Sequence, residues 1–244
     1  MMPAMFVEHA HPMTALDRSC DTEAWSECGP AVPVPRAILV VSVHSYVNAT
    51  TVTSMTRPRT VHDSFRFLEA LFDVQYPAPG DPELASRIVD LIRTTLVGLD
   101  ANNWGIDHGT WSVPVHMFPR TDVPVLQLSI NSSLPYEHHF ALGGERHALR
   151  HVGVFIVTSG NVGHNLRLID FGRGDPQGAP RRRRELERSV SHVDFSRAVP
   201  TTDYLVPLAY LAGRSAVAVQ SAATFVDGYE RGSLSMTANA VAGA

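Results

Sequence analysis

The chain has 244 residues, of which 44% are hydrophobic and 18% charged, and its formal net charge at pH 7 is -4. This length and apolar content can build one sizeable core, so we expect residues 1–244 to form a single domain. A slightly acidic chain has no general attraction for polyanions, which disfavours nucleic acid as a partner.

The N-terminal segment and the cysteines indicate a protein of a reducing compartment. Met1–Val7 lacks the basic and long apolar regions of a secretory signal, and the strongest apolar run, Ala37–Val43, is too short to cross a bilayer. Cys20 and Cys28 lie in a stretch that reads as a loop, and two cysteines cannot form a disulfide framework for a chain of this size. We therefore predict a soluble, cytoplasmic protein that does not associate with a membrane.

Four apolar segments have the composition of buried strands, and three of them lead into a histidine. The segments are Met5–Val7, Ala37–Val43, Val123–Ile130 and Val152–Thr158. His9 follows the first, His44 the second and His164 the last. Because ligands of open α/β sheets gather beyond the carboxyl ends of the strands, we expect these three side chains to meet there.

Helical patterns alternate with these strands. They cover Asp63–Phe72, Pro82–Leu96 with Asp81 as N-cap, Tyr136–His151 and Tyr204–Leu211. Towards the end of the chain, Ala216–Val219 and Gly232–Met236 suggest a returning strand pair. The alternation predicts an α/β fold with a central mixed β-sheet flanked by helices, and a metal site at the C-terminal ends of its strands.

A Gly-, Pro- and Arg-rich stretch, Phe171–Arg184, interrupts this pattern and predicts a mobile surface loop inside a variable region, 171–200. It ends in four consecutive arginines, Arg181–Arg184, which an anionic substrate or partner could use. Glu185 and Glu187 follow directly, so a solvated and partly self-paired surface is the favoured interpretation.

Histidine is the unusual component of the sequence, with 12 residues. Any single histidine after a strand can simply hydrogen-bond a loop. Three neutral imidazoles at rigid strand ends are instead well suited to a divalent transition metal, which indicates a metal site on His9, His44 and His164.

Several short motifs, in this order, resemble those of the class III (LigB-type) extradiol ring-cleavage dioxygenases, in the branch similar to 4,5-DOPA dioxygenase. The resemblance covers about Met5–Arg167 and Tyr204–Met236. The matching segments are His9 with Pro12, Val40–His44, Thr60–Asp63, Tyr76–Gly80, Trp104–Trp111, Gln127–Ile130, Ser159–Asn165 and Gly232–Met236.

The resemblance implies roles for individual residues. His9 and His44 would bind the metal, His164 would bind it or act as acid/base, and His108 would face the substrate. A catechol-type substrate would chelate the metal through two oxygens while O2 takes a free position, and nearby groups would move protons. His62 could orient the substrate or cap the following helix.

Three departures from the family pattern affect this site. The family usually has Gly-His-Gly-Ser-Pro where this chain has Glu8-His9-Ala10-His11-Pro12, so we expect a reshaped loop, with His11 as a possible extra ligand, proton carrier or substrate contact. A further metal-binding histidine is replaced by Tyr204 in an ungapped match, or by Asp203 if one residue is inserted. We favour Asp203 as ligand and count Tyr204 among the catalytic residues, with His108 and His164.

The third departure is a shorter stretch between Arg167 and Tyr204, which would open or remodel the pocket. Six other histidines match no motif and are expected to face solvent: His116, His138, His139, His147, His151 and His192.

The leading hypothesis is an iron(II)-dependent extradiol dioxygenase that opens a small catechol-type aromatic ring with O2. One divalent metal per chain is expected, and zinc can occupy the same site because imidazole suits both metals. The second hypothesis is a zinc-dependent hydrolase, lyase or cyclase on the same fold. The third is a non-catalytic relative that acts as a binding protein.

Overall fold

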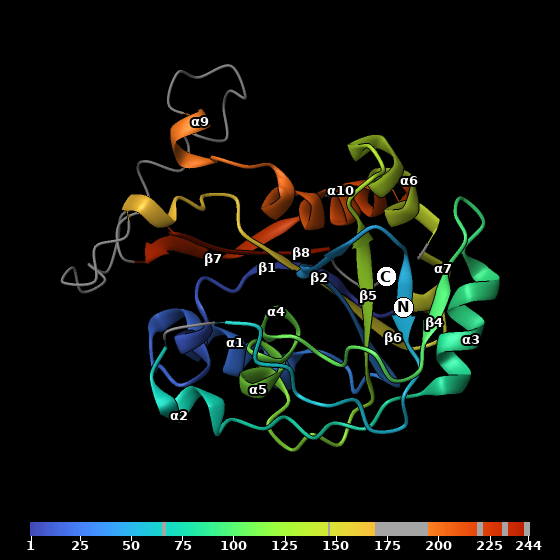
Figure 1. Ribbon diagram of the computed structural model, residues 1–244, viewed down its shortest axis with the longest axis horizontal. Coiled ribbons are helices and arrows are strands. Elements are labelled where there is room, and N and C mark those ends of the chain that lie inside the picture. Colours follow the sequence, from blue (N-terminus) through green and yellow to red (C-terminus); the bar gives the residue numbers. More distant parts are fainter. Residues whose placement is uncertain (65–66, 146, 169–194, 219–221, 231–233, 242–244) are drawn as a thin grey trace.

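The computed structural model describes residues 1–64, 67–145, 147–168, 195–218, 222–230 and 234–241, and in these ranges one β-sheet forms the centre of the molecule (Figure 1). Its eight strands have the order β4-β3-β5-β2-β6-β1-β8-β7. They are β1 (Ala4–Glu8), β2 (Ala37–Val47), β3 (Thr51–Thr53), β4 (Gly98–Asp100), β5 (Val125–Asn131), β6 (Val154–Gly160), β7 (Ala223–Glu230) and β8 (Leu234–Val241).

The four strands predicted from apolar runs form the parallel centre of this sheet. β5, β2, β6 and β1 are neighbours in that order and all run parallel. β8 pairs antiparallel with β1, and β3 pairs antiparallel with β5, so the sheet is mixed. The central strands read as continuous apolar runs because helices cover both of their faces. The predicted α/β fold with a mixed sheet is confirmed.

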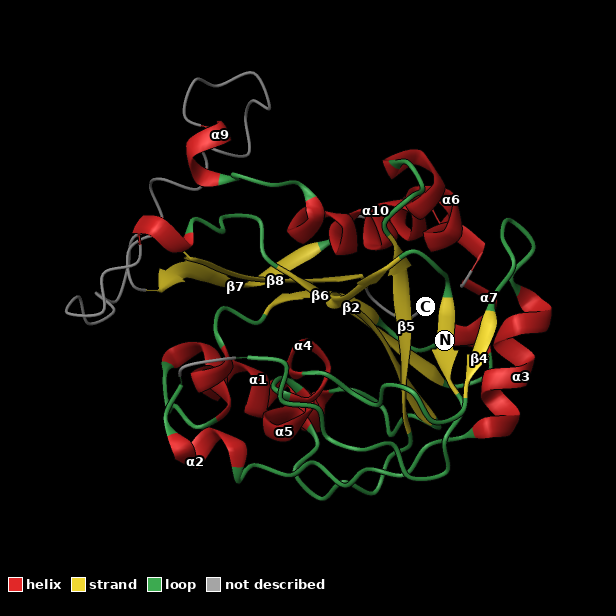
Figure 2. Cartoon of the chain, in the orientation of Figure 1, coloured by secondary structure: helices red, strands yellow, loops and turns green. Residues whose placement is uncertain are grey.

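Helices pack on both faces of the sheet (Figure 2). One face carries α1 (Cys20–Ala31), α2 (Glu69–Phe72), α4 (His108–Trp111) and α5 (Pro114–Met117). The other carries α3 (Pro82–Leu91), α6 (Tyr136–Glu145), α7 (His147–His151) and α10 (Val206–Ala218). Shorter elements are the 3-10 helices η1 (Pro12–Ala15), η2 (Leu166–Leu168) and η3 (Asp203–Leu205), and the helix α9 (Phe195–Ala198).

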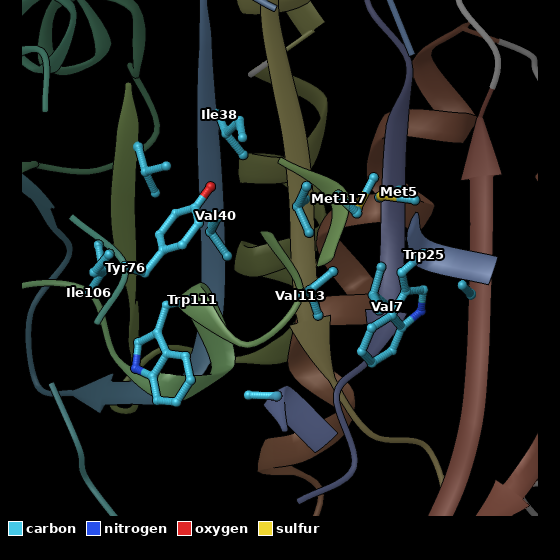
Figure 3. Packing of buried hydrophobic residues seen from close by; sticks show 14 of the residues in the cluster. Met5, Val7, Trp25, Ile38, Val40, Tyr76, Ile106, Trp111, Val113 and Met117 are labelled. Atoms are coloured by element: carbon cyan, nitrogen blue, oxygen red, sulfur yellow. The ribbon is translucent and has the colours of Figure 1, made fainter. Parts of the chain in front are cut away.

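Alternation along the central strands divides the core into two layers and orients the site. Met5 and Val7 of β1 lie beside Trp25 in the core layer on the α1/α4 face, which also contains Trp111 (Figure 3), whereas Phe6 belongs to the layer on the α3/α6/α10 face. Side chains two residues apart share a face. His9 after β1, His44 in β2 and Ser159 in β6 therefore continue the rows that face α1 and α4.

Several predicted boundaries are wrong. The stretch with Cys20 and Cys28 is helix α1, which begins with a capping box between Ser19 and Thr22. Few of its residues are buried, so its sequence shows little of the apolar periodicity that marks a helix. The helix expected to reach Leu96 ends at Leu91, where Ile92 turns to extended backbone.

Other expected elements also differ. Asp63, Ser64, Phe67 and Leu68 are not helical, and helix α2 covers only Glu69–Phe72 of that segment. Tyr136–His151 contains two helices, α6 and α7. Ala216–Ala218 belongs to α10, so the returning strand pair is β7 with β8 instead. Phe171–Arg184 and the arginine run lie outside the described residues. No helix in the described ranges is both long and apolar enough to span a bilayer.

Two glycines allow α6 and α10 to pack closely. A Cβ atom on Gly213 would lie 1.8 Å from the carbonyl oxygen of Phe140, and one on Gly143 would lie 2.3 Å from that of Tyr210. Beside this crossing, His139 is buried and its Nδ1 lies 2.9 Å from the Tyr210 hydroxyl, so the expectation that His139 faces solvent is wrong. This close packing of α6 against α10 fixes the position of α10, which begins directly after η3.

We predict that Gly213→Ala lowers the free energy of unfolding by about 1–3 kcal/mol, because the added methyl group meets backbone that cannot move aside. Chemical denaturation of purified protein measures the change. Gly228→Ala is the matched control, since no atom lies within 4 Å of a Cβ at that position. Equal stability of Gly213→Ala and the wild type would contradict the close approach.

Candidate metal centre

Three histidines from three elements form a compact cluster. One ligating nitrogen from each of His9, His44 and His108 lies within 4.8 Å of the other two. His9 directly follows β1, His44 lies inside β2 rather than beyond its end, and His108 is the first residue of α4. The Nε2 atoms of His9 and His44 are 3.1 Å apart. Among the described residues, this is the group of His, Cys, Asp and Glu side chains with the spacing of metal ligands.

His9 is fully buried, and a hydrogen bond holds the ring nitrogen that does not face His44. Its Nδ1 lies 2.8 Å from the Oγ of Ser159, which comes from the adjacent parallel strand β6. Burial, and after it the neighbouring histidines, hold the pKa of His9 well below 6.5. The imidazole is therefore neutral near pH 7, the form that binds metals.

Asp63 connects the other two histidines. Its carboxylate oxygens lie 3.0 Å from Nδ1 of His44 and 2.8 Å from Nδ1 of His108, and it also accepts the backbone N–H of His108. Although burial acts to raise the pKa of Asp63, hydrogen bonds from the two imidazoles hold it well below the usual range. An ionised carboxylate only accepts hydrogen bonds, so both Nδ1 atoms carry hydrogen and, in the neutral rings, both Nε2 atoms present lone pairs.

Sequence reasoning missed Asp63. It is the last residue of the segment Thr60–Asp63, in which only His62 was predicted to have a role at the site. The available signal was an acidic residue next to a histidine inside a motif, since metal-ligating histidines commonly donate their second N–H to a carboxylate.

His108 is buried, and its ring centroid lies 3.7 Å from that of His44. Burial, followed by the nearby His44, lowers the pKa of His108 to about 4. The ring is therefore neutral near pH 7 and can accept a proton at Nε2.

Asp107 fixes the start of α4 and so positions His108. It is the N-cap of that helix and accepts hydrogen bonds from Thr110 N–H, from the Ser42 hydroxyl at 2.6 Å and from Gln127 Nε2 at 2.7 Å. Ser42 is in β2 and Gln127 in β5, so one buried carboxyl ties the helix to two strands. Burial raises the pKa of Asp107.

His164, Tyr204 and Asp203 form a second layer against the cluster. The His164 ring stacks on Tyr204 with centroids 3.5 Å apart, and Tyr204 meets the His44 ring edge-on at 5.8 Å. Burial lowers the pKa of His164, which the nearby Asp203 partly opposes, and burial raises the pKa of Tyr204 to about 12. The buried Oδ1 of Asp203 has no hydrogen-bond partner among the described residues.

His11 and His62 occupy different positions at the edge. His11 is buried, its Nδ1 accepts the N–H of Met13, and its ring stacks on Phe67. His62 packs against Trp111 and its Nε2 lies 3.0 Å from the carbonyl oxygen of Val74. The alternative that His62 caps the next helix is wrong, because Leu68 is the N-cap of α2.

The loop after His9 retains a conformation suited to glycine. Ala10 has φ 53°, in the left-handed region that a residue with a Cβ atom enters only at a cost. The alanine therefore places strain on the segment between His9 and His11.

The remaining histidines stay outside the cluster. His151 is exposed as expected, whereas His116 and His138 are half-buried, with His116 Nε2 3.0 Å from the carbonyl oxygen of Thr14. The side chain of His147, and His192 altogether, lie outside the described residues.

Comparison with known proteins agrees with this geometry. The family described as the catalytic LigB subunit of aromatic ring-opening dioxygenase matches residues 18–182. The chain is 41% identical to the 4,5-DOPA dioxygenase extradiol of Escherichia coli (strain K12), over 96% of this chain and 93% of that protein. It is 37% identical to the 4,5-DOPA dioxygenase extradiol of Beta vulgaris, over 65% of this chain and 61% of that protein.

A solved structure extends the similarity to the whole fold. The crystal structure of an uncharacterized protein from Escherichia coli K12 matches with a TM-score of 0.79 and 34% sequence identity, covering 99% of this chain and 100% of that one. The chain therefore belongs to the LigB family of aromatic ring-opening dioxygenases. Within that family, its relatives place it in the branch of the 4,5-DOPA dioxygenases, as its motifs predicted.

We predict that Asp63→Asn lowers the free energy of unfolding of the metal-free protein by about 1–3 kcal/mol at pH 7, because an amide cannot accept all the hydrogen bonds that the carboxylate accepts. The folded pKa of Asp63 lies below the ordinary 3.8, so its stabilisation is complete above that pH and declines as pH falls below it. Urea unfolding should thus show a larger deficit at pH 7 than at pH 3.5.

The matched control for this prediction is Asp73→Ala, which removes an exposed carboxylate next to α2 and should change stability by less than about 0.5 kcal/mol. A deficit for Asp63→Asn that is the same at both pH values would show that the ionised carboxylate does not stabilise the fold.

Proposed function

We propose that this chain is a metal-dependent extradiol dioxygenase that opens a catechol-type ring with O2, next to its two hydroxyl groups. The observation that carries the proposal is the pair of Nε2 atoms on His9 and His44, 3.1 Å apart. Each ring is held at Nδ1, by Ser159 and by Asp63. This leaves two Nε2 atoms directed at one another, an arrangement that a shared cation stabilises.

The donor set fits one divalent transition metal per chain. Imidazole nitrogen suits both iron(II) and zinc(II), of which iron(II) is the metal for oxygen chemistry. We propose His9 and His44 as ligands and either His164 or Asp203 as the third donor. The buried, unpaired oxygen of Asp203 supports a role near a cation. When bound, the metal supplies positions for the two catechol oxygens and for O2.

His108 is the proposed general base. Its neutral ring lies beside His44, so its Nε2 would be available to a phenolic hydroxyl of a catechol that binds next to His9 and His44. Asp63 holds its Nδ1–H and thereby fixes the ring orientation. The proton of a phenolic hydroxyl passes to Nε2 of His108. His164 and Tyr204, stacked on each other next to His44, are the proposed groups that return a proton during ring opening.

A cavity of about 310 Å³ opens beside His44 and has the size of a small aromatic substrate. Val47, Leu99 and Trp104 contribute apolar lining. Polar groups come from Asp100 and from the hydroxyl and amide side chains of Ser45, Thr51, Thr53, Asn103, Gln127 and Ser129. The two relatives named for DOPA support a catechol as the substrate class. His11 and His62 are the proposed further contacts of the substrate at the edge of the site.

We predict that metal-free protein reconstituted anaerobically with iron(II) takes up O2 with a member of a catechol panel and forms a yellow ring-opened product. His9→Ala and His44→Ala should each bind less than about a tenth of an equivalent of metal, because two fixed imidazoles form the site. His151→Ala, an exposed histidine in α7, should behave as the wild type.

One bound metal without O2 uptake on any catechol would contradict the dioxygenase. Tight zinc with turnover that does not need oxygen would instead establish the non-oxidative hydrolase, lyase or cyclase. Biological activity that survives both ligand substitutions would establish the binding relative.

We predict a different pattern for the two remaining histidines. His108→Ala should keep its metal and lose activity by about 10²–10⁴-fold, because it removes a base and not a ligand. His164→Ala should weaken metal binding. Metal analysis and single-turnover kinetics on the two variants measure both effects. Loss of the metal in His108→Ala would instead identify His9, His44 and His108 as the ligand set.

A further inference from the structure

The loop that carries His164 has no regular structure, yet it is firmly held. Loops are ordinarily the mobile parts of a fold, and a functional side chain on a loop needs support from its surroundings. Four successive backbone N–H groups each donate to a different element: Asn161 to Tyr204 O, Val162 to Glu8 Oε1, Gly163 to Ser235 Oγ and His164 to Ala198 O.

Glu8 is the central acceptor in this set. It is the last residue of β1, it is fully buried, and it directly precedes His9. One oxygen, Oε1, accepts both the N–H of Val162 and the hydroxyl of Ser235, the latter at 2.6 Å. Hydrogen bonds to a carboxylate in a buried site are strong, and a buried carboxylate is retained only where such bonds exist.

Ser235 holds the same loop from the neighbouring strand β8. It lies in β8, the antiparallel neighbour of β1. Its Oγ accepts the N–H of Gly163 at 2.5 Å, and its own N–H donates to the Gly163 carbonyl oxygen at 3.0 Å. Asn161 adds a bond from Nδ2 to the Ser235 carbonyl oxygen. The loop is therefore held between β1 and β8, one residue before His164.

The anchor depends on a departure of this chain from its family pattern. The usual pattern has glycine at the position of Glu8, and glycine has no side chain that could accept these two bonds. The Ser235 side of the connection belongs to the Gly232–Met236 segment that does match the family.

We infer that Glu8 is a positioning residue of this site: its carboxylate fixes the loop 161–164 and thereby sets where the His164 ring stands relative to His9 and His44. Glu8 acts through hydrogen bonds to the loop, and alternation along β1 directs its side chain to the face opposite His9. The kinetic part of this inference rests on the proposed function, whereas the anchoring of the loop does not.

The test compares Glu8→Ala, Glu8→Gln and Ser235→Ala in metal-loaded protein, with Glu83→Ala, an exposed glutamate in α3, as the matched control. Glu8→Ala and Ser235→Ala should lower kcat by about 10- to 100-fold and change KM less than about threefold. Glu8→Gln keeps an acceptor oxygen, so it should retain kcat within about threefold of the wild type.

Amide hydrogen exchange is the readout that does not need activity. Exchange at Val162 and Gly163 should become at least about tenfold faster in Glu8→Ala, stay near the wild-type rate in Glu8→Gln, and remain unchanged at Leu126 in β5 in both. Unchanged protection and kcat in Glu8→Ala would overturn the inference. So would equal losses in Glu8→Gln and Glu8→Ala, because charge and not hydrogen bonding would then be responsible.

Two further outcomes are distinguishable. If Glu8→Ala does not fold, Ser235→Ala decides, since it leaves the carboxylate in place and removes its partner. If the wild type opens no catechol, the proposed function fails, while amide exchange still confirms or overturns the anchor.

Discussion

The site depends on one constraint: β1, β6, β2 and β5 run parallel, so their carboxyl ends meet along one edge of the sheet. In each strand, every second side chain points to the α1/α4 face. These side chains are apolar along most of the strand and polar near the edge where the carboxyl ends meet. Val7 gives way to His9 and Val157 to Ser159. The histidine cluster is therefore the polar continuation of the core layer whose hydrophobic residues are shown in Figure 3.

The strands deliver His9 and His44, but carboxylates complete the arrangement. Asp63 connects His44 to His108 and fixes which nitrogen of each ring carries hydrogen. Asp107 holds the helix that begins at His108 against two strands. Both acids are largely or fully buried and both are hydrogen-bonded, as buried carboxyl groups must be. The imidazoles are thus oriented by the protein alone, which lowers the cost of organising the site around a metal.

The departures from the family pattern lie close to the histidines and not in the core. Ala10 takes the left-handed backbone conformation that favours glycine, and Glu8 uses a position where glycine is usual to hold the His164 loop. Tyr204 and Asp203 lie next to His164, so most of these departures border the His164 loop or His9. The family fold is retained while the surroundings of His164 differ.

By itself, the sequence determined the central strands, the mixed α/β fold and the pair His9 and His44. Long apolar runs specify buried parallel strands, and a residue at the end of such a strand can occupy only a narrow range of positions. It did not determine α1, whose few buried residues leave no periodic signal, or the burial of His139, which depends on a glycine-mediated helix crossing. Only the tertiary structure brought Asp63 and Glu8 to the site, because their partners are distant in the chain: His44 lies 19 residues from Asp63, and Ser235 lies 227 residues from Glu8. Such contacts follow from how the elements pack, which no local pattern of residues encodes.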